Sequence, residues 1–179
     1  MRELSLNILD IAQNSIAAGA PLTEILVKEN TAENTLLIGI YDNGKGMSEE
    51  QVKNVQDPFF TTRTTRKVGM GIPLFKLAAE QTGGSFKITS ELGVGTRVDA
   101  LFKTDSIDFT PLGDIEATVS TIVSMNEDKD FVYTRSIDGK EFTFKSADIK
   151  LILDGVPLSE PSVMSWIEDY IAENTLSIE

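Results

Sequence analysis

Four short polar motifs follow one another along the first part of this chain, and each lies where an apolar segment begins or ends. In chain order they are Asp10 with Asn14, residues 42–46 (DNGKG), residues 69–71 (GMG) and residues 93–96 (GVGT). Glycine allows tight turns and a close approach of the backbone to a ligand, whereas amide and carboxylate side chains bind polar groups. Each motif alone is an ordinary turn or helix surface, but their fixed order at these joints favours a shared role.

Apolar periodicity and the positions of glycine and proline predict helices and strands along the whole chain. Helices are expected at 3–18, 48–56, 72–81, 114–125, 147–153 and 161–173. Strands are expected at 23–28, 35–41, 86–90, 97–102, 131–134 and 141–145. The last two strands flank Asp138-Gly139, a typical hairpin turn. The expected fold therefore combines helices with strands.

Charge is spread unevenly over the chain, whose formal net charge is -12. Residues 1–103 contain 11 basic and 12 acidic groups, whereas residues 104–179 contain 5 basic and 16 acidic groups. An acidic surplus argues against nucleic-acid binding, which needs basic groups to displace the counterions of phosphate. The change in composition also indicates a boundary between two regions.

Composition excludes several further classes of protein. The sequence contains no cysteine, so it has neither a disulfide framework nor a thiolate metal site, and it contains no histidine. No stretch approaches the roughly 20 apolar residues that span a bilayer. The N-terminal residues lead directly into an amphipathic run without the layout of a signal peptide. We expect a cytoplasmic protein without a membrane partner.

Asp10 and Asn14 are four residues apart on the first expected helix, which places a carboxylate and a carboxamide one turn apart on one face. An amide oxygen is a natural Mg²⁺ ligand beside triphosphate oxygens and waters. A carboxylate one turn away can orient an attacking water or hydroxyl. The same pair is also typical of the solvent-exposed face of any amphipathic helix, and this purely structural alternative stays open.

The other three motifs also fit a nucleotide pocket. Asp42 follows an apolar strand, where its carboxylate can accept a hydrogen bond from an exocyclic amine such as that of adenine. Residues 69–71 open a helix next to several cations, and backbone N–H groups at a helix start suit a polyphosphate. Thr96 lies in a turn from which its hydroxyl can reach a ligand. Plain turns and a flexible surface loop are the alternatives.

Taken together, these motifs resemble the N, G1, G2 and G3 boxes of the GHKL superfamily of ATPases. The resemblance covers residues 4–102. Residues 57–102 are most similar to sensor histidine kinases, whereas 13–20 are closer to mismatch-repair ATPases. The resemblance implies the Bergerat ATP-binding fold, a two-layer α/β sandwich with a mixed, mostly antiparallel sheet and ATP between the helices and a lid.

The resemblance also implies a role for each matching position, with ATP and Mg²⁺ as cofactors. It makes Asn14 the Mg²⁺ ligand and Asp42 the adenine anchor. Asp10 becomes the candidate catalytic group, because ATP-hydrolysing members have a glutamate base there. Residues 59–71 would form the lid over the phosphates. The other residues expected to bind the nucleotide are Gly44, Gly46, Met47, Phe60, Arg63, Lys67, Gly69, Met70, Gly71, Leu74 and Thr96.

Departures from the family pattern narrow the expected activity. Ala17 stands where many kinases have a lysine, and no counterpart is found of the catalytic lysine in the second domain of gyrase and mismatch-repair ATPases. Without histidine, the chain lacks the phosphoacceptor of a complete histidine kinase. We therefore expect a kinase that phosphorylates a partner in trans, on histidine, or on serine or threonine as anti-sigma kinases do. An ATP-gated switch with little turnover and a slow hydrolase using Asp10 are the alternatives.

Two regions follow from these patterns. Residues 1–104 are expected to form the histidine kinase-like ATPase domain, and 111–179 a small acidic α+β annex of unknown role. Trp166 and Tyr170 in the last expected helix belong either to its core or to a partner surface. The expected partner is a phosphoacceptor or regulatory protein, and a homodimer is also compatible with the sequence.

Overall fold

A computed structural model describes residues 3–59 and 70–179, and its elements follow the expected order. The strands are β1 (Leu22–Asn30), β2 (Thr35–Asp42), β3 (Ser85–Glu91), β4 (Gly95–Lys103), β5 (Asp130–Ile137) and β6 (Lys140–Lys145). The helices are α1 (Leu4–Ala17), α2 (Glu49–Val55), α3 (Gly71–Gln81), α4 (Ile115–Met125), α5 (Ser146–Leu153) and α6 (Pro161–Ile178). Most strands extend beyond the expected apolar runs, because the ladder between backbones continues through polar pairs such as Asn30 with Thr35.

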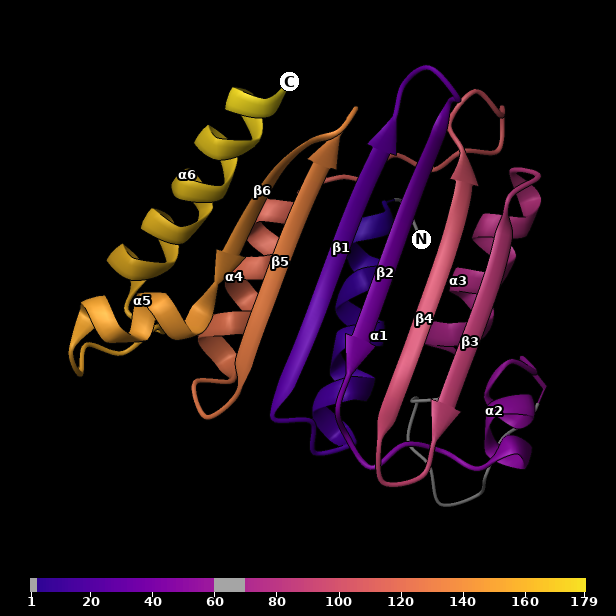
Figure 1. Ribbon diagram of the computed structural model, residues 1–179, viewed down its shortest axis with the longest axis horizontal. Coiled ribbons are helices and arrows are strands. Elements are labelled where there is room, and N and C mark those ends of the chain that lie inside the picture. Colours follow the sequence, from indigo (N-terminus) through magenta and orange to yellow (C-terminus); the bar gives the residue numbers. More distant parts are fainter. Residues whose placement is uncertain (1–2, 60–69) are drawn as a thin grey trace.

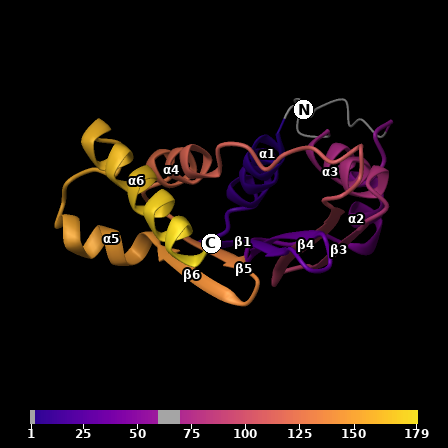
Figure 2. The same ribbon diagram turned by 90° about the horizontal axis from the view of Figure 1, so that it is seen from above.

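The strands form one six-stranded sheet in the order β3-β4-β2-β1-β5-β6 (Figure 1). Every neighbouring pair is antiparallel except β1 with β5, which is parallel. Helices α1, α3 and α4 cover one face of this sheet (Figure 2). The expected two-layer α/β sandwich with a mixed, mostly antiparallel sheet is therefore confirmed.

Period-two burial along the central strands creates the contact between the two layers. In β2, Leu36, Ile38 and Ile40 are buried on the face that meets the helices. Helix α1 buries its own stripe against them, including Leu4 and Ile8, which are fully buried. Apolar area removed from water stabilises folding by roughly 25 cal/mol per Å², so this shared face anchors α1 on the sheet. The anchoring positions the polar residues of α1 over the end of β2.

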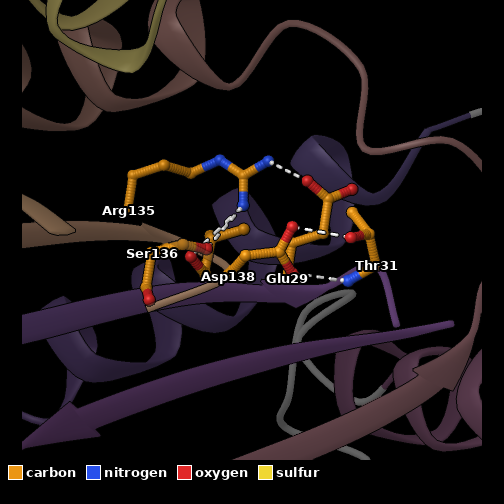
Figure 3. A network of polar contacts seen from close by, with 6 residues as sticks. Glu29, Thr31, Arg135, Ser136 and Asp138 are labelled. Carbon is orange, nitrogen blue, oxygen red and sulfur yellow. Dashed lines mark hydrogen bonds and ion pairs between the residues drawn. The ribbon is translucent and has the colours of Figure 1, made fainter. Parts of the chain in front are cut away.

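The C-terminal hairpin joins the same sheet through β1. Arg135 is buried and pairs with Glu29 at 3.3 Å, and it also donates to the carbonyl of Val27 (Figure 3). In the turn of the hairpin, Asp138 accepts hydrogen bonds from the Thr31 backbone N–H at 2.8 Å and the Thr31 hydroxyl at 2.6 Å. These contacts link β5 and its turn to the far end of β1.

Helix α4 links this hairpin region back to α1. The N–H groups of Leu4 and Ser5 donate to the carbonyls of Pro111 and Leu112, both at 2.8 Å. Residues of both regions belong to one continuous hydrophobic core. The expected division between 104 and 111 falls in the connection before α4, and the assignment of 1–104 and 111–179 as two regions stays a prediction.

Among the helices within 3–59 and 70–179, none combines the length and the apolar character that a transmembrane span requires.

Candidate functional site

A cavity of about 220 Å³ lies between α1 and the ends of β2 and β4. It is where three of the four sequence motifs meet. Its polar lining comes from Asn14, Ser15, Asp42, Lys45 and Thr96. Its remaining lining is apolar or glycine and comes from Ile11, Ala17, Ala18, Ile40, Gly46, Met47, Val55, Ile72 and Val98. Mostly apolar walls with a few convergent polar groups are typical of ligand sites.

The carboxylate of Asp42 is held in one orientation at the end of β2. Its Oδ2 accepts a hydrogen bond from the Ser15 hydroxyl at 2.7 Å. Its Oδ1 accepts one from the Gly44 backbone N–H at 2.9 Å. Each carboxylate oxygen has two lone pairs, so both oxygens keep acceptor capacity for a ligand.

Asn14 lines the same cavity from α1, one residue before Ser15. Asp10 lies one turn earlier, beside the start of α3. A Cβ built on Gly71 would lie 3.3 Å from the Cβ of Asp10, so a larger residue at Gly71 would press against the base of this side chain. Partial burial raises the pKa of Asp10, because desolvation disfavours the charged form. A carboxylate with a raised pKa is a better proton acceptor in its ionised form than an exposed one.

The loop after β2 and the turn between β3 and β4 interlock beside the cavity. Gly46 has a φ of +69° and packs against the carbonyl of Glu91, where a Cβ would collide with the backbone. Gly95 approaches the carbonyl of Asp42 equally closely. The N–H of Gly93 donates to the Lys45 carbonyl at 2.7 Å. Glycine is therefore required at Gly46 by both conformation and space.

Thr96 faces Asp42 across the ladder between β4 and β2 and lines the cavity. Its hydroxyl lies 2.8 Å from the hydroxyl of Ser90, which is its register partner on β3. Two of the expected ligand-binding groups are thus brought together on neighbouring strands.

The structure places the remaining predicted residues as follows. Met47 and Gly46 line the cavity, and Gly44 packs against Ala18 at its rim. Met70 and Leu74 flank the first turn of α3 but do not line the cavity as it stands. Phe60, Arg63, Lys67 and Gly69 lie outside the described residues.

Ser15 and Ser90 are site residues that sequence reasoning missed. Ser15 lies four residues after Ile11 on the buried face of α1, and a buried polar side chain on such a face signals a specific partner. Ser90 has no comparable signal, since its importance depends on its register with Thr96.

A larger hollow of about 430 Å³ lies on the other face of the same strand ends. It shares Asp42 and Thr96 with the first cavity but is bounded by outward-facing side chains such as Tyr41 and Arg97. None of the α1 residues contributes to it. The smaller cavity is the candidate site, because it alone combines Asn14 with Asp42 among the described residues.

Comparison with known proteins finds a family model and several sensor proteins that match this chain. Residues 1–106 match the model of the family described as histidine kinase-, DNA gyrase B-, and HSP90-like ATPase. The C4-dicarboxylate transport sensor protein DctB of Pseudomonas aeruginosa is 29% identical over 99 residues, which are 55% of this chain and 16% of that protein. Sensor protein SrrB of Staphylococcus aureus is 36% identical over 101 residues, which are 54% of this chain and 17% of that protein.

The chain thus spans about one sixth of the length of these sensor proteins. Among solved structures, the Aquifex aeolicus MutL ATPase domain complexed with ADP aligns with a TM-score of 0.49 at 13% identity. That alignment covers 86% of this chain and 70% of the other. Because the family model matches more than half of the chain, the protein belongs to the family of histidine kinase-, DNA gyrase B- and HSP90-like ATPases and contains its ATP-binding domain.

Proposed function

We propose that this protein binds Mg-ATP in the cavity under α1 and transfers the γ-phosphoryl group to an acceptor outside these 179 residues. One observation carries the proposal: Asp42 is held by Ser15 and Gly44 with its acceptor capacity directed into a cavity that Asn14 also lines. This arrangement separates an end suited to a base from an end suited to phosphates.

The base would lie against Asp42 and Thr96. Both groups can accept a hydrogen bond from an exocyclic amine, and the apolar walls from Ile40, Val98 and Met47 suit a flat aromatic ring. Fixed acceptors in an apolar cavity discriminate strongly, because a ligand without the matching donor leaves them unpaired. Adenine is the base that fits this arrangement.

The phosphates would extend along α1 toward Asn14 and Asp10. The amide oxygen of Asn14 fits Mg²⁺, which takes few protein ligands and completes its octahedron with phosphate oxygens and waters. When bound, such an ion neutralises charge on the transferring group. Asp10, which lies beside the start of α3, would orient an acceptor hydroxyl or imidazole in this proposal. We assign Arg63 and Lys67 to the phosphates on the resemblance alone.

The acceptor belongs to a partner protein in this proposal. The sequence has no histidine, so a phosphohistidine would have to form outside it, and a partner serine or threonine is the other option. The sensor proteins DctB and SrrB match 99 and 101 residues of the chain. Their names support a role in signalling.

An ATP-gated switch is the second candidate, and the packing of α1 favours it. Helix α1 carries Asn14, and its first two N–H groups donate hydrogen bonds to the backbone carbonyls of Pro111 and Leu112. A displacement of α1 on nucleotide binding would therefore reach the acidic region 104–179. In this case binding would be tight and turnover negligible.

Incubation of the purified protein with γ-labelled Mg-ATP tests the proposal. The protein is incubated alone and with a cytosolic extract, and both free phosphate and protein-bound label are followed. We expect label on a second protein, acid-labile for phosphohistidine and acid-stable for phosphoserine or phosphothreonine. Asp42→Asn is the control and should weaken ATP binding at least about tenfold, or about 1.4 kcal/mol.

Three outcomes separate the candidates. Nucleotide binding with neither label on any protein nor released phosphate would reject the kinase and favour the switch. Free phosphate alone, lost in Asp10→Asn with binding retained, would identify a hydrolase. Absence of ATP binding in the parent protein would overturn all three.

A further inference from the structure

Ser90 connects three parts of the molecule beside the nucleotide cavity without lining the cavity itself. Its hydroxyl oxygen accepts a hydrogen bond from the Met47 backbone N–H at 2.8 Å. The same oxygen lies 2.9 Å from the Gly95 carbonyl oxygen, to which its proton is donated. It also lies 2.8 Å from the Thr96 hydroxyl. The loop after β2, strand β3 and the start of β4 therefore meet at one side chain.

The proton count of these contacts decides the direction of the last one. A hydroxyl has one proton to donate and two lone pairs that accept. The Gly95 carbonyl has no proton to donate, so Ser90 donates its only proton to this carbonyl. The hydrogen bond between Ser90 and Thr96 must then be donated by Thr96. Ser90 accepts from Met47 and Thr96 and donates to Gly95, which uses its whole capacity.

We infer that Ser90 is a positioning residue that orders the Thr96 proton and makes Thr96 an obligate acceptor toward the nucleotide. Because the Thr96 proton points to Ser90, only lone pairs of its oxygen remain for the cavity. Asp42, its register partner, also offers only acceptors there. Two neighbouring acceptors select a ligand with an amino group and disfavour one with a carbonyl or no substituent at the same position.

This inference rests on the proposed binding of ATP and refines it. Without Ser90, the Thr96 hydroxyl could rotate and donate instead, so the cavity would accept bases that lack the amine. If Ser90 had only a structural role, its replacement would weaken the binding of all nucleotides by the same factor. The ratio between nucleotides therefore separates positioning from structure.

Ser90→Thr and Ser90→Val form a matched pair, because threonine and valine have nearly the same shape and both suit a strand, but only threonine keeps a hydroxyl. The dissociation constants of ATP and of purine riboside triphosphate, which lacks the 6-amino group, are measured by calorimetry for each protein. If Ser90→Val fails to fold, Ser90→Ala also removes the hydroxyl and introduces a smaller side chain.

We expect Ser90→Thr to keep the preference of the parent protein for ATP. In Ser90→Val the preference should fall about threefold to tenfold, the range that one ordinary hydrogen bond contributes. It should not fall below the preference of Thr96→Val, and adding Ser90→Val to Thr96→Val should not change the preference further.

An unchanged preference in both Ser90→Val and Ser90→Ala would overturn the inference while leaving ATP binding intact. Failure of the parent protein to bind ATP would instead overturn the proposed function, and the inference with it.

Discussion

Individual side chains in this site are defined by what they donate to and accept from. Ser15 and Gly44 hold the carboxylate of Asp42, and the hydroxyl of Thr96 lies 2.8 Å from that of Ser90, which we infer orients its proton. Asp10 differs from both, since no side-chain partner is recorded for it among the described residues and burial dominates its behaviour. Its protonation is therefore the property most easily measured at this scale.

Replacement of Asp10 by asparagine is expected to stabilise the protein at neutral pH. Burial raises the pKa of Asp10 above its value in the unfolded chain, about 3.9, so the folded state binds this proton more tightly. The favourable contribution is complete below the unfolded pKa and is lost as the pH rises through the folded pKa. Asp10→Asn cannot ionise and escapes this loss.

Melting temperatures of the parent protein and Asp10→Asn from pH 3.5 to pH 7 check this expectation. The melting temperature of the variant should rise relative to that of the parent protein as the pH increases. The same substitution at exposed Asp105 controls for the loss of one negative charge. A difference that shrinks as the pH rises would show that ionised Asp10 is stabilised by its surroundings, contrary to the desolvation argument.

At the scale of elements, the two glycine-rich connections are parts of one structure. The loop after β2 and the turn between β3 and β4 fit together only because Gly46 and Gly95 lack side chains. Their backbones approach so closely that any Cβ would displace a neighbouring carbonyl. This contact positions the segments that carry Met47 and Thr96, which both line the cavity.

Gly46→Ala and Gly83→Ala form a matched comparison for this contact. Both glycines have positive φ, +69° and +82°, but no heavy atom lies within 4 Å of a Cβ built on Gly83. Gly83→Ala should lower the free energy of unfolding by about 1 to 2 kcal/mol, because of the left-handed conformation alone. Gly46→Ala should cost at least about 2 kcal/mol more, because it also displaces the backbone at Glu91.

Urea unfolding of both variants gives the comparison directly, provided that the m-values stay equal. An equal decrease in the free energy of unfolding for both variants would mean that separating the two loops does not destabilise the protein. Binding of ATP to Gly46→Ala should also weaken, whereas Gly83→Ala should bind like the parent protein.

For the whole molecule, the question is whether the acidic region senses the nucleotide. Strand β5 pairs with β1 over Leu22–Glu29, and α1 packs on both the sheet and α4. Trp166, the only tryptophan, lies on α6 with its ring stacked on Tyr170 at 5.0 Å. Its fluorescence therefore reports on a region remote in sequence from the candidate site.

Saturating ATP is expected to raise the melting temperature reported by Trp166 as much as that reported by far-ultraviolet circular dichroism. At a ligand concentration of 100 Kd the stabilisation is about 2.7 kcal/mol. Asp42→Asn should reduce the shift in both signals to the same extent. If Trp166 melts separately and without response to ATP, the regions 1–104 and 111–179 are independent domains.

Local patterns in the sequence account for most of the elements seen here. Helix α2 starts at Ser48 with a reciprocal capping box to Gln51, and the β5–β6 turn follows from Asp138-Gly139. These signals act between residues close in the chain, so they can be recognised without the fold. The order of the four motifs likewise sufficed to identify the family and to name Asn14, Asp42 and Thr96.

Tertiary structure alone decided how those residues became a site. Ser15 meets Asp42 across 27 positions of the chain, and β5 lies parallel to β1 more than a hundred residues away. Such contacts depend on strand register and on the packing of α1 over the sheet, and neither has a local signature. Hydrophobic patterning determines which face of an element is buried, but the partner on that face is chosen by packing and hydrogen bonding among all the elements at once.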